Sequence, residues 1–309
     1  MGKIAFVFPG QGTQYTGMGK DIYENNLVAR DVFNQIEEVR PNTIKQCFES
    51  DISELSITEN TQPCIFAVEM SLACALKSAG IEPDCLAGFS LGEVTALTFS
   101  NILSFNDGIK FICKRAEYMQ SAIKKIDTGM IAVMKLDNKT VEDIAEKFTS
   151  VFPVNYNCPG QLVVAGDKSQ LEDFSKAIDE KGGKSVLLKV SGGFHSPFME
   201  EASNKILEEL NNIKFNLPKY QVYSNYTSKV YTDDVKTLLA MQVKKPVLWE
   251  NTINNMIDDG VDTFIEVGPG KVLSGLIKKI NKEVNLYNVE DNITLKSVVD
   301  RLGTLNREG

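Results

Sequence analysis

The stretch at residues 85–99 constrains the fold of this chain more than any other part. It reads CLAGFSLGEVTALTF, in which a short apolar run is followed by Ser90 between two glycines and then by helix-forming residues. An apolar run of this length is typical of a buried strand. A glycine on each side of the serine indicates a turn so tight that a Cβ would crowd the strand or the helix. The stretch therefore predicts a buried strand that turns sharply into a helix, with Ser90 at the tip of the turn.

Alternating strand and helix patterns on both sides of this turn predict an α/β fold. Short apolar runs favour strands at 4–8, 220–226, 264–268 and 284–289. Helix-forming segments are expected at 62–79, about 197–213 and about 249–259. Two further helices are expected, one that ends at 242 and one that begins at 271. In the helix at 62–79 we expect Pro63 in the first turn and Gly80 just beyond the end.

The segment at 126–193 has a different rhythm. Strand patterns at 130–136, 151–157, 161–167 and 184–190 surround helix patterns that follow residue 137 and span 169–182. The order βαββαβ is typical of a small ferredoxin-like module. We therefore expect 126–193 to be a ferredoxin-like subdomain inserted into a larger α/β domain made of 1–125 and 194–309.

Composition and charge exclude several classes of function. The chain of 309 residues carries a formal net charge of -8, which argues against a general nucleic-acid binder. The six cysteines form no C-x-x-C pair and are expected to be buried thiols of a reducing compartment. No secretory signal and no apolar run of about 18 residues is present, so we expect a cytoplasmic protein with no membrane span. A single histidine, His195, excludes a zinc site built on several histidines, and no metal is expected.

The glycine-rich loop GQGTQYTGMGK at 10–20 departs from both common phosphate-binding patterns. A G-x-G-x-x-G motif would need glycine at Tyr15, and a P-loop would need lysine at Met18. These glycines are instead expected to let backbone N–H groups approach a ligand. We accordingly expect no bound cofactor.

Ser90 is a candidate nucleophile, because a strand, a sharp turn with serine and a helix form a nucleophile elbow. A serine needs a base to take its proton, and His195 is the only histidine in the chain. It follows Gly192-Gly193, where the predicted small subdomain returns to the large domain. Because substrate clefts often form at such seams, we pair His195 with Ser90.

Eight sequence blocks resemble the malonyl-CoA:acyl carrier protein transacylase family and occur in the family's order over nearly the whole chain. They are FVFPGQGTQ, TQP (61–63), GFSLGE, KRAEYMQ (114–120), NCPGQLVVAG (157–166), GGFHSPFM (192–199), QVKKPVLW (242–249) and EVGPGKVLSGL (266–276). The resemblance implies an α/β-hydrolase-like core with an inserted ferredoxin-like subdomain. One departure is Phe89, where the family has histidine in GHSLGE, and this puts the fine tuning of the site in doubt.

The resemblance also implies catalytic roles. Ser90 would attack the thioester of malonyl-CoA, and His195 would take the proton and return it to the leaving thiol. A glutamine carbonyl, at Gln242, would fix the His195 tautomer. The alternative for Gln242 is a solvated helix residue. The backbone N–H groups of Gln11 and Leu91 would form the oxyanion hole.

Arg115 is the specificity residue by resemblance, because a guanidinium fork pairs with the free carboxylate of a malonyl group. The alternative is a surface arginine, although Arg115 follows the apolar run IKFIC and is one of only five arginines. Phe194 would crowd the acyl Cα and favour malonyl over methylmalonyl. Gln62, Met119, Asn157 and Gln161 match family positions near the site. A helix-terminal role for Gln62 and a turn role for Asn157 and Gln161 are the alternatives.

The reaction implied is ping-pong malonyl transfer from malonyl-CoA to acyl carrier protein, feeding fatty-acid elongation, by a monomer without a bound cofactor. A freestanding acyltransferase of a polyketide synthase would share these motifs. A serine acyl hydrolase and an inactive carrier-docking scaffold are more distant alternatives. Because carrier proteins are acidic, local lysine pairs are candidate docking points: Lys124-Lys125, Lys244-Lys245 and Lys278-Lys279.

Overall fold

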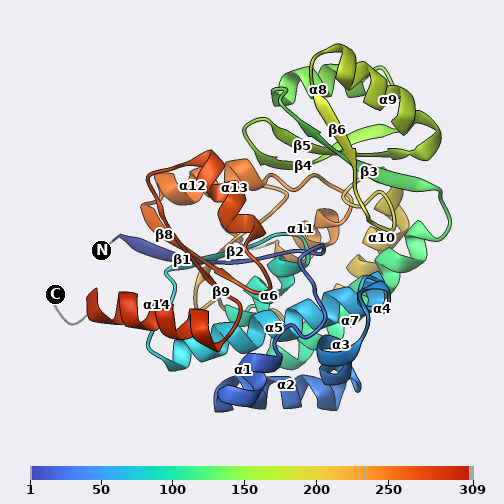
Figure 1. The fold of residues 1–309 in the computed structure, drawn as a ribbon. Helices are drawn as coiled ribbons and strands as arrows, with labels where there is room; N and C mark the ends of the chain where they lie inside the picture. Colours follow the sequence, from blue (N-terminus) through green and yellow to red (C-terminus); the bar gives the residue numbers. More distant parts are fainter. Residues whose placement is uncertain (1, 233, 306–309) are drawn as a thin grey trace.

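The computed structural model describes residues 2–232 and 234–305, and it contains two separate β-sheets (Figure 1). The larger sheet has five strands in the order β7-β2-β1-β8-β9, and all neighbours are parallel. Its strands are β1 (Lys3–Phe8), β2 (Cys85–Gly88), β7 (Gln221–Tyr223), β8 (Val261–Val267) and β9 (Asn285–Val289). Because the strands are parallel, the loops at their carboxyl ends gather along one edge, where α/β proteins bind ligands.

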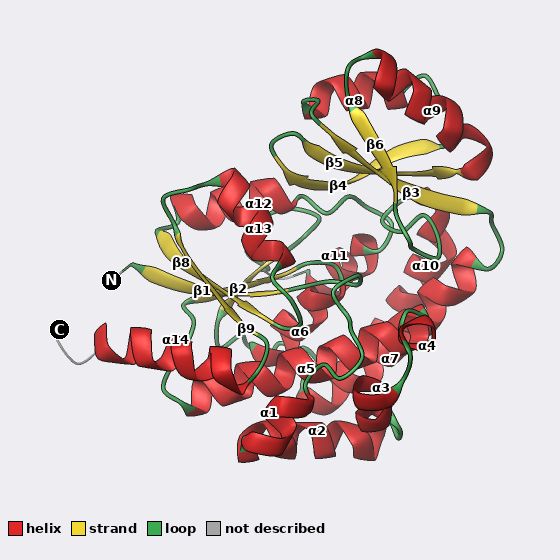
Figure 2. Ribbon diagram, viewed as in Figure 1, coloured by secondary structure: helices red, strands yellow, loops and turns green. Residues whose placement is uncertain are grey.

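Helices cover both faces of this sheet (Figure 2). On one face lie α12 (Trp249–Asp258) and α13 (Val272–Ile280), and on the other α5 (Thr58–Ser78), α6 (Leu91–Phe99) and α14 (Asn292–Leu305). An outer layer contains α1 (Lys20–Asn25), α2 (Leu27–Val39), α3 (Thr43–Glu49), α4 (Ile52–Leu55) and α7 (Phe105–Ile123). The remaining helices of this part are η1 (Pro197–Met199), α10 (Glu200–Leu210) and α11 (Val235–Gln242). The mixed α/β fold predicted from the sequence is confirmed.

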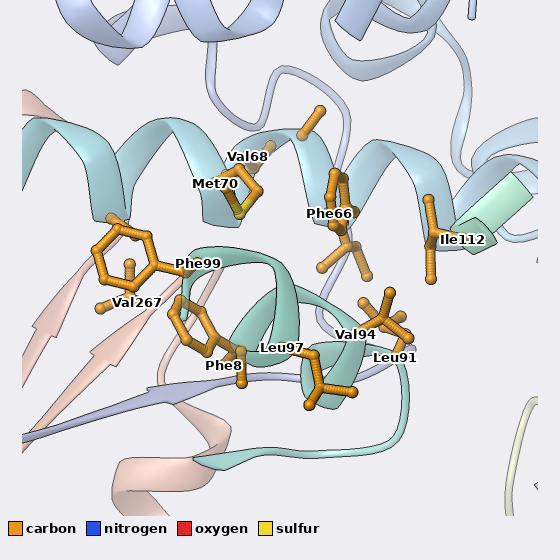
Figure 3. Close-up of a cluster of buried hydrophobic side chains, with 14 of the residues drawn as sticks. Phe8, Phe66, Val68, Met70, Leu91, Val94, Leu97, Phe99, Ile112 and Val267 are labelled. Carbon is orange, nitrogen blue, oxygen red and sulfur yellow. The ribbon is translucent and has the colours of Figure 1, made fainter. Parts of the chain in front are cut away.

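The core between the sheet and α5 fixes α6, the helix that starts directly after Ser90. Leu91, Val94 and Leu97 of α6 lie in one buried cluster with Phe8 of β1 and Phe66 of α5 (Figure 3). Helix α5 is buried along nearly all of 61–76, so apolar residues occur on every side of it. This packing holds the start of α6 rigidly against the end of β1.

The smaller sheet has four strands in the order β4-β5-β3-β6, and all neighbours are antiparallel. Its strands are β3 (Thr128–Met134), β4 (Val151–Cys158), β5 (Gln161–Asp167) and β6 (Lys184–Leu187). Helices α8 (Asn138–Ala145) and α9 (Lys168–Glu180) cover the face that lies away from the larger sheet (Figure 1). The other face points toward the large part of the molecule.

Some predicted boundaries were wrong. Helix α5 begins at Thr58, so Pro63 lies in its second turn rather than its first. The proline lacks the N–H that would bond the Glu59 carbonyl, and Arg40 Nη2 donates to that oxygen at 3.4 Å instead. Strands β6 and β7 are shorter than the patterns at 184–190 and 220–226, and the expected helix at 197–213 is a 3₁₀ turn followed by α10.

All six cysteines are free thiols, and four of them, Cys47, Cys64, Cys85 and Cys158, are buried. This agrees with their interpretation as small buried residues rather than a disulfide framework. Among the helices of the described ranges, none combines the length and the apolar character that crossing a membrane requires.

Candidate active site

Ser90 lies between β2 and α6 in a strained backbone conformation, with φ 56° and ψ -104°. Such a conformation costs on the order of 1–3 kcal/mol unless the surroundings enforce it. A Cβ on Gly88 would lie 1.9 Å from the carbonyl carbon of Gly92, and a Cβ on Gly92 would lie 2.2 Å from the Phe8 carbonyl oxygen. Both glycines are therefore required by close backbone contact, as the sequence indicated.

His195 forms hydrogen bonds on both sides of its ring. Its Nδ1 lies 2.8 Å from the main-chain carbonyl oxygen of Gln242, and its Nε2 lies 2.8 Å from Ser90 Oγ. A carbonyl only accepts, so in the neutral imidazole Nδ1 carries the proton and Nε2 is the acceptor. The Ser90 hydroxyl can then donate to Nε2, which is the arrangement for passing its proton to a base.

Burial, together with the nearby Arg115 guanidinium, lowers the pKa of His195 to about 4. The imidazole is thus neutral at physiological pH and free to accept a proton. The turn that presents it is unusual, since His195 has a φ of 59° and its N–H donates to the Val243 carbonyl at 3.0 Å.

Gln242 lies at the end of α11, and its side chain is buried, so the solvated alternative is wrong. The contact with His195 uses the main-chain carbonyl, while the side chain has separate partners. Its Oε1 accepts from Arg115 Nη2 at 2.8 Å, and its Nε2 donates to the Ser90 carbonyl at 2.7 Å and to Glu93 Oε2 at 2.8 Å. One residue therefore joins the base, the serine turn and the arginine.

Arg115 comes from α7 and is completely buried, so the surface alternative is also wrong. Its Nη1 donates to Gln62 Oε1 at 2.6 Å, and its Nη2 donates to Ser90 Oγ at 3.2 Å as well as to Gln242. Desolvation lowers the pKa of Arg115 to about 10, against the opposing effect of the Glu93 carboxylate. The side chain remains a cation at neutral pH. Its buried Nε has no partner among the described residues, so donors remain for an anionic ligand.

A cavity of about 100 Å³ opens beside Ser90 and His195. Its wall combines residues of the large part with Met130 and Asn155 from the smaller sheet. The predicted site residues that line it are Gln11, Gln62, Ser90, Leu91, Met119, Phe194 and His195. Arg115 and Gln242 border it through their bonds to Gln62 and Ser90. The structure thus brings residues from distant parts of the sequence to one cavity.

Asn157 does not line this cavity and instead lies on the wall of an adjoining cavity of about 200 Å³. This second cavity also contains Gln161 and shares Gln11, Phe89 and Asn155 with the first. The side-chain oxygens of Asn155 and Asn157 are buried and have no hydrogen-bond partner in the described part of the chain. The two cavities therefore adjoin, and the residues with unused acceptors are Asn155, which lines both cavities, and Asn157, which lines the second.

The backbone amides of Gln11 and Leu91 have no acceptor among the described residues, although both residues line the cavity beside Ser90. A Cβ on Gly10 would lie 2.8 Å from the Phe89 carbonyl oxygen, so this glycine lets the loop approach the serine turn. At Gly12 the reason is conformation rather than crowding, because its φ is 108° and no atom lies near the position of a Cβ. Two free amides beside a hydroxyl can stabilise a developing oxyanion.

Comparison with known proteins identifies the family. The profile of the family described as acyl transferase domain matches residues 5–307. The chain belongs to the acyl transferase family. This acyl transferase is 38% identical to the malonyl CoA-acyl carrier protein transacylase of Bacillus subtilis (strain 168), over 98% of each chain.

Solved structures give the same result. The malonyl CoA-acyl carrier protein transacylase of Clostridium perfringens ATCC 13124 matches with a TM-score of 0.95 and 40% identity, covering 98% of both chains. A malonyl-transacylase in complex with its type II polyketide synthase acyl carrier protein gives a TM-score of 0.94 at 30% identity, covering 97% of this chain and 99% of the other. The resemblance inferred from the sequence blocks is confirmed, and the chain is an acyltransferase.

Phe89, which departs from the motif expected for an acyl transferase of this kind, packs edge-on against Trp249 with ring centroids 5.5 Å apart. The buried indole Nε1 of Trp249 has no hydrogen-bond partner among the described residues. Phe89 lines both cavities and makes their shared wall more apolar.

Two buried residues of this acyl transferase were not assigned a role from the sequence. Glu93 accepts hydrogen bonds from Gln242, from the Asn225 backbone N–H at 3.2 Å and from the Tyr231 hydroxyl. Burial raises the pKa of Glu93 to about 7, although these donors oppose the shift. Asn225 bonds directly to the serine turn. The sequence contained a signal for each residue. Glu93 is a carboxylate within the apolar run LGEVTALTF, and Asn225 is a polar residue just after a strand of the parallel sheet.

Proposed function

We propose that this acyltransferase moves the malonyl group from malonyl-CoA to the phosphopantetheine thiol of acyl carrier protein through a malonyl-Ser90 intermediate. One observation carries this choice of substrate: the buried Arg115 guanidinium lies 3.2 Å from Ser90 Oγ. An acyl group on Ser90 that ends in a carboxylate would bring its charge to this cation. The names of the relatives support the same assignment.

In the first half-reaction Ser90 Oγ attacks the thioester carbonyl while His195 Nε2 takes the hydroxyl proton. The Gln242 carbonyl holds the Nδ1 proton of the resulting imidazolium, and the amides of Gln11 and Leu91 stabilise the oxyanion. The carbon–sulfur bond then breaks, and His195 returns its proton to the coenzyme A thiolate. In the second half-reaction the carrier thiol gives its proton to His195 and attacks the malonyl ester, and Ser90 is released with its proton restored.

Gln62 and Gln242 fix the guanidinium of Arg115 through its two terminal nitrogens. Met119 supports Gln62, because its sulfur accepts from Gln62 Nε2 at 3.5 Å. Phe194, on the wall beside His195, would limit the space at the acyl Cα and favour malonyl over methylmalonyl. Selection would thus combine a charged anchor with a steric limit.

The adjoining cavity would receive the pantetheine arm that both donor and acceptor carry. Such an arm contains two amide groups, and the unpartnered oxygens of Asn155 and Asn157 are acceptors of the right type for amide N–H groups. The apolar residues Leu188 and Leu276 would contact its methylene segments. Asn157 is therefore assigned to substrate binding rather than to the chemical step.

We predict that incubation with malonyl-CoA adds one malonyl mass to the protein, measured on the intact chain, and that Ser90→Ala takes up none. Addition of holo acyl carrier protein should then remove the label and produce malonyl-carrier. Labelling that persists in Ser90→Ala would contradict the assignment of the nucleophile.

The same experiment separates transfer from hydrolysis. A serine acyl hydrolase would release free malonate without carrier protein, whereas the proposed enzyme should hold the ester until the carrier thiol arrives. Service to a polyketide synthase uses the same chemistry, so the identity of the carrier protein that accepts the malonyl group fastest decides between that role and fatty-acid elongation.

For the architecture, we propose an α/β-hydrolase-like core of residues 1–125 and 194–309 with a ferredoxin-like subdomain at 126–193. The small-sheet order β4-β5-β3-β6 is the order in which a βαββαβ unit pairs its strands in that motif. The nucleophile elbow between β2 and α6 supports the hydrolase-like core. A cytoplasmic monomer remains our expectation.

For carrier docking we propose the pair Lys278 and Lys279. Both are exposed on α13, whose residues Leu273 and Leu276 line the adjoining cavity. In the described part of the chain no carboxylate forms an ion pair with this pair. By contrast, both lysines of the pair Lys124-Lys125 contact glutamates, Lys125 at 2.6 Å from Glu201. In the pair Lys244-Lys245, Lys244 contacts Glu200.

Reversing both charges with Lys278→Glu and Lys279→Glu should therefore raise the KM for carrier protein roughly 3- to 10-fold and weaken its salt dependence. Steady-state transfer assays over a salt series measure both effects. The matched control is Lys124→Glu with Lys125→Glu, which should leave the carrier KM near the wild-type value. An equal effect of the two double variants would argue against docking on α13.

A further inference from the structure

The strained backbone of Ser90 is held from outside its own turn. Its side chain cannot cap α6, because Oγ is engaged with His195 Nε2 and Arg115 Nη2. The Ser90 N–H instead donates to Asn225 Oδ1 at 2.7 Å. The Gly88 carbonyl, two residues earlier, accepts from Asn225 Nδ2 at 2.5 Å. One side-chain amide therefore bridges the two backbone groups that flank Phe89.

This bridge continues the hydrogen bonding between β2 and β7 beyond the last paired residues. Strands β2 and β7 are parallel and in register through Ala87 and Tyr223, after which β2 turns into the elbow. In a parallel ladder, the N–H of one residue donates to a carbonyl on the neighbouring strand. The carbonyl of the same residue accepts from an N–H that lies two residues later on that strand. The primary amide of Asn225 makes this pair of bonds to Gly88 and Ser90, just beyond the point where the ladder stops.

Asn225 is itself fixed. It is fully buried, its N–H donates to Glu93 Oε2 at 3.2 Å, and its carbonyl accepts from the Leu248 N–H at 2.8 Å. Glu93 Oε2 also accepts from Gln242 Nε2, which in turn donates to the Ser90 carbonyl. Both backbone polar groups of Ser90 thus bond to the side chains of Asn225 and Gln242, and both of these residues donate to Glu93 Oε2, Asn225 through its backbone N–H and Gln242 through its side chain.

We propose that Asn225 is a positioning residue of this acyltransferase, whose side-chain amide holds Ser90 in its strained conformation so that Oγ faces His195. It acts through Ser90 and does not touch the substrate. This inference rests on the proposed role of Ser90 as the nucleophile. The same bridge keeps the first amide of α6, that of Leu91, directed at the cavity.

We expect Asn225→Ala to slow malonylation of Ser90 in single-turnover experiments by about 10- to 100-fold, since a misplacement of about 1 Å costs this much in an oriented reaction. The KM for malonyl-CoA should change less than about threefold, because Arg115 and its two partners, Gln62 and Gln242, stay in place. Reaction of Ser90 with a small fluorophosphonate, which forms the Ser90 O–P bond and releases fluoride, should slow by a similar factor. That reagent carries no carboxylate and so reports the serine alone.

Asn225→Leu provides a second variant of similar size. Its side chain neither accepts from the Ser90 N–H nor donates to the Gly88 carbonyl, so acylation should again fall. Asn255→Ala is the control, because it removes a part-buried amide contact of 2.7 Å to the Ser228 carbonyl, outside the serine turn. Rates are divided by the folded fraction, measured by thermal unfolding.

Wild-type acylation by a normalised Asn225→Ala or Asn225→Leu protein overturns the proposal. So does a loss that merely follows the folded fraction, or one that Asn255→Ala reproduces. If the wild type takes up no malonyl group, the proposed function fails instead, and the fluorophosphonate reaction still decides whether Asn225 positions Ser90.

Discussion

His195→Ala should reduce malonyl transfer by roughly 10²–10⁴-fold, the range that general acid–base catalysis supplies. Among the described residues, His195 and Arg115 are the two that hydrogen-bond Ser90 Oγ, and of these the imidazole can take its proton, because Arg115 is a donor. The chain has no second histidine to replace it. Single-turnover acylation from malonyl-CoA measures the loss directly.

A matched control for this variant is Ser196→Ala. Ser196 is the next residue, and its hydroxyl donates to the Gly193 carbonyl at 2.6 Å, so the change disturbs the same turn but keeps the base. Near-normal acylation by His195→Ala, or an equal loss in Ser196→Ala, would exclude His195 as the base.

The pH dependence follows from the same contacts. The base works in its neutral form, and its pKa is lowered to about 4 from 6.5. The kcat/KM for malonyl-CoA, which reports the free enzyme, should therefore rise with pH through about 4, the pKa of the base. A midpoint near 6.5 in brief pH-jump assays would show that burial and Arg115 do not act on His195 as described.

Arg115→Ala should lower kcat/KM for malonyl-CoA by about 30- to 4,000-fold, because truncating one partner of a buried charge pair costs on the order of 2–5 kcal/mol. Acetyl-CoA has no carboxylate and should lose much less. The kcat/KM for acetyl-CoA should even rise, because wild-type protein with an acetyl group in the site keeps Arg115 desolvated without a counterion, and Arg115→Ala removes that cost. The ratio of kcat/KM values for the two substrates is the decisive measurement.

Two further variants sharpen this prediction. Arg115→Lys should restore only part of the malonyl rate, since an ammonium cannot form a two-bond fork with a carboxylate. Arg40→Ala, which removes a half-buried arginine bonded to Thr43 and Asn60, should leave the substrate ratio unchanged. Arg115→Ala should also raise the pKa of His195 and move the kcat/KM midpoint upward, because the guanidinium is one of its two lowering causes. Equal losses for malonyl-CoA and acetyl-CoA would make Arg115 a structural residue.

Local patterns were sufficient for much of the fold. The elbow around Ser90, the alternation of strands and helices and the βαββαβ order depend on neighbours in the sequence, and they were predicted. Boundaries were wrong where distant residues intervened. Pro63 stands in the second turn of α5, and Arg40, which directly follows α2, contacts the carbonyl that the proline leaves free.

The sequence by itself determined which residues are available for the chemistry: one serine in an elbow, one histidine and an arginine after an apolar run. It could not determine how these residues are held. Gln242 serves His195 with its main chain and Arg115 with its side chain, and Asn225 reaches Ser90 across a difference of 135 positions. Such contacts depend on which strands and helices pack together, because hydrogen-bond geometry is set by distance in space and leaves no periodic signal along the chain. Only the tertiary structure therefore decided that Arg115 is buried beside the nucleophile and that the turn at Ser90 is fixed from the far half of the chain.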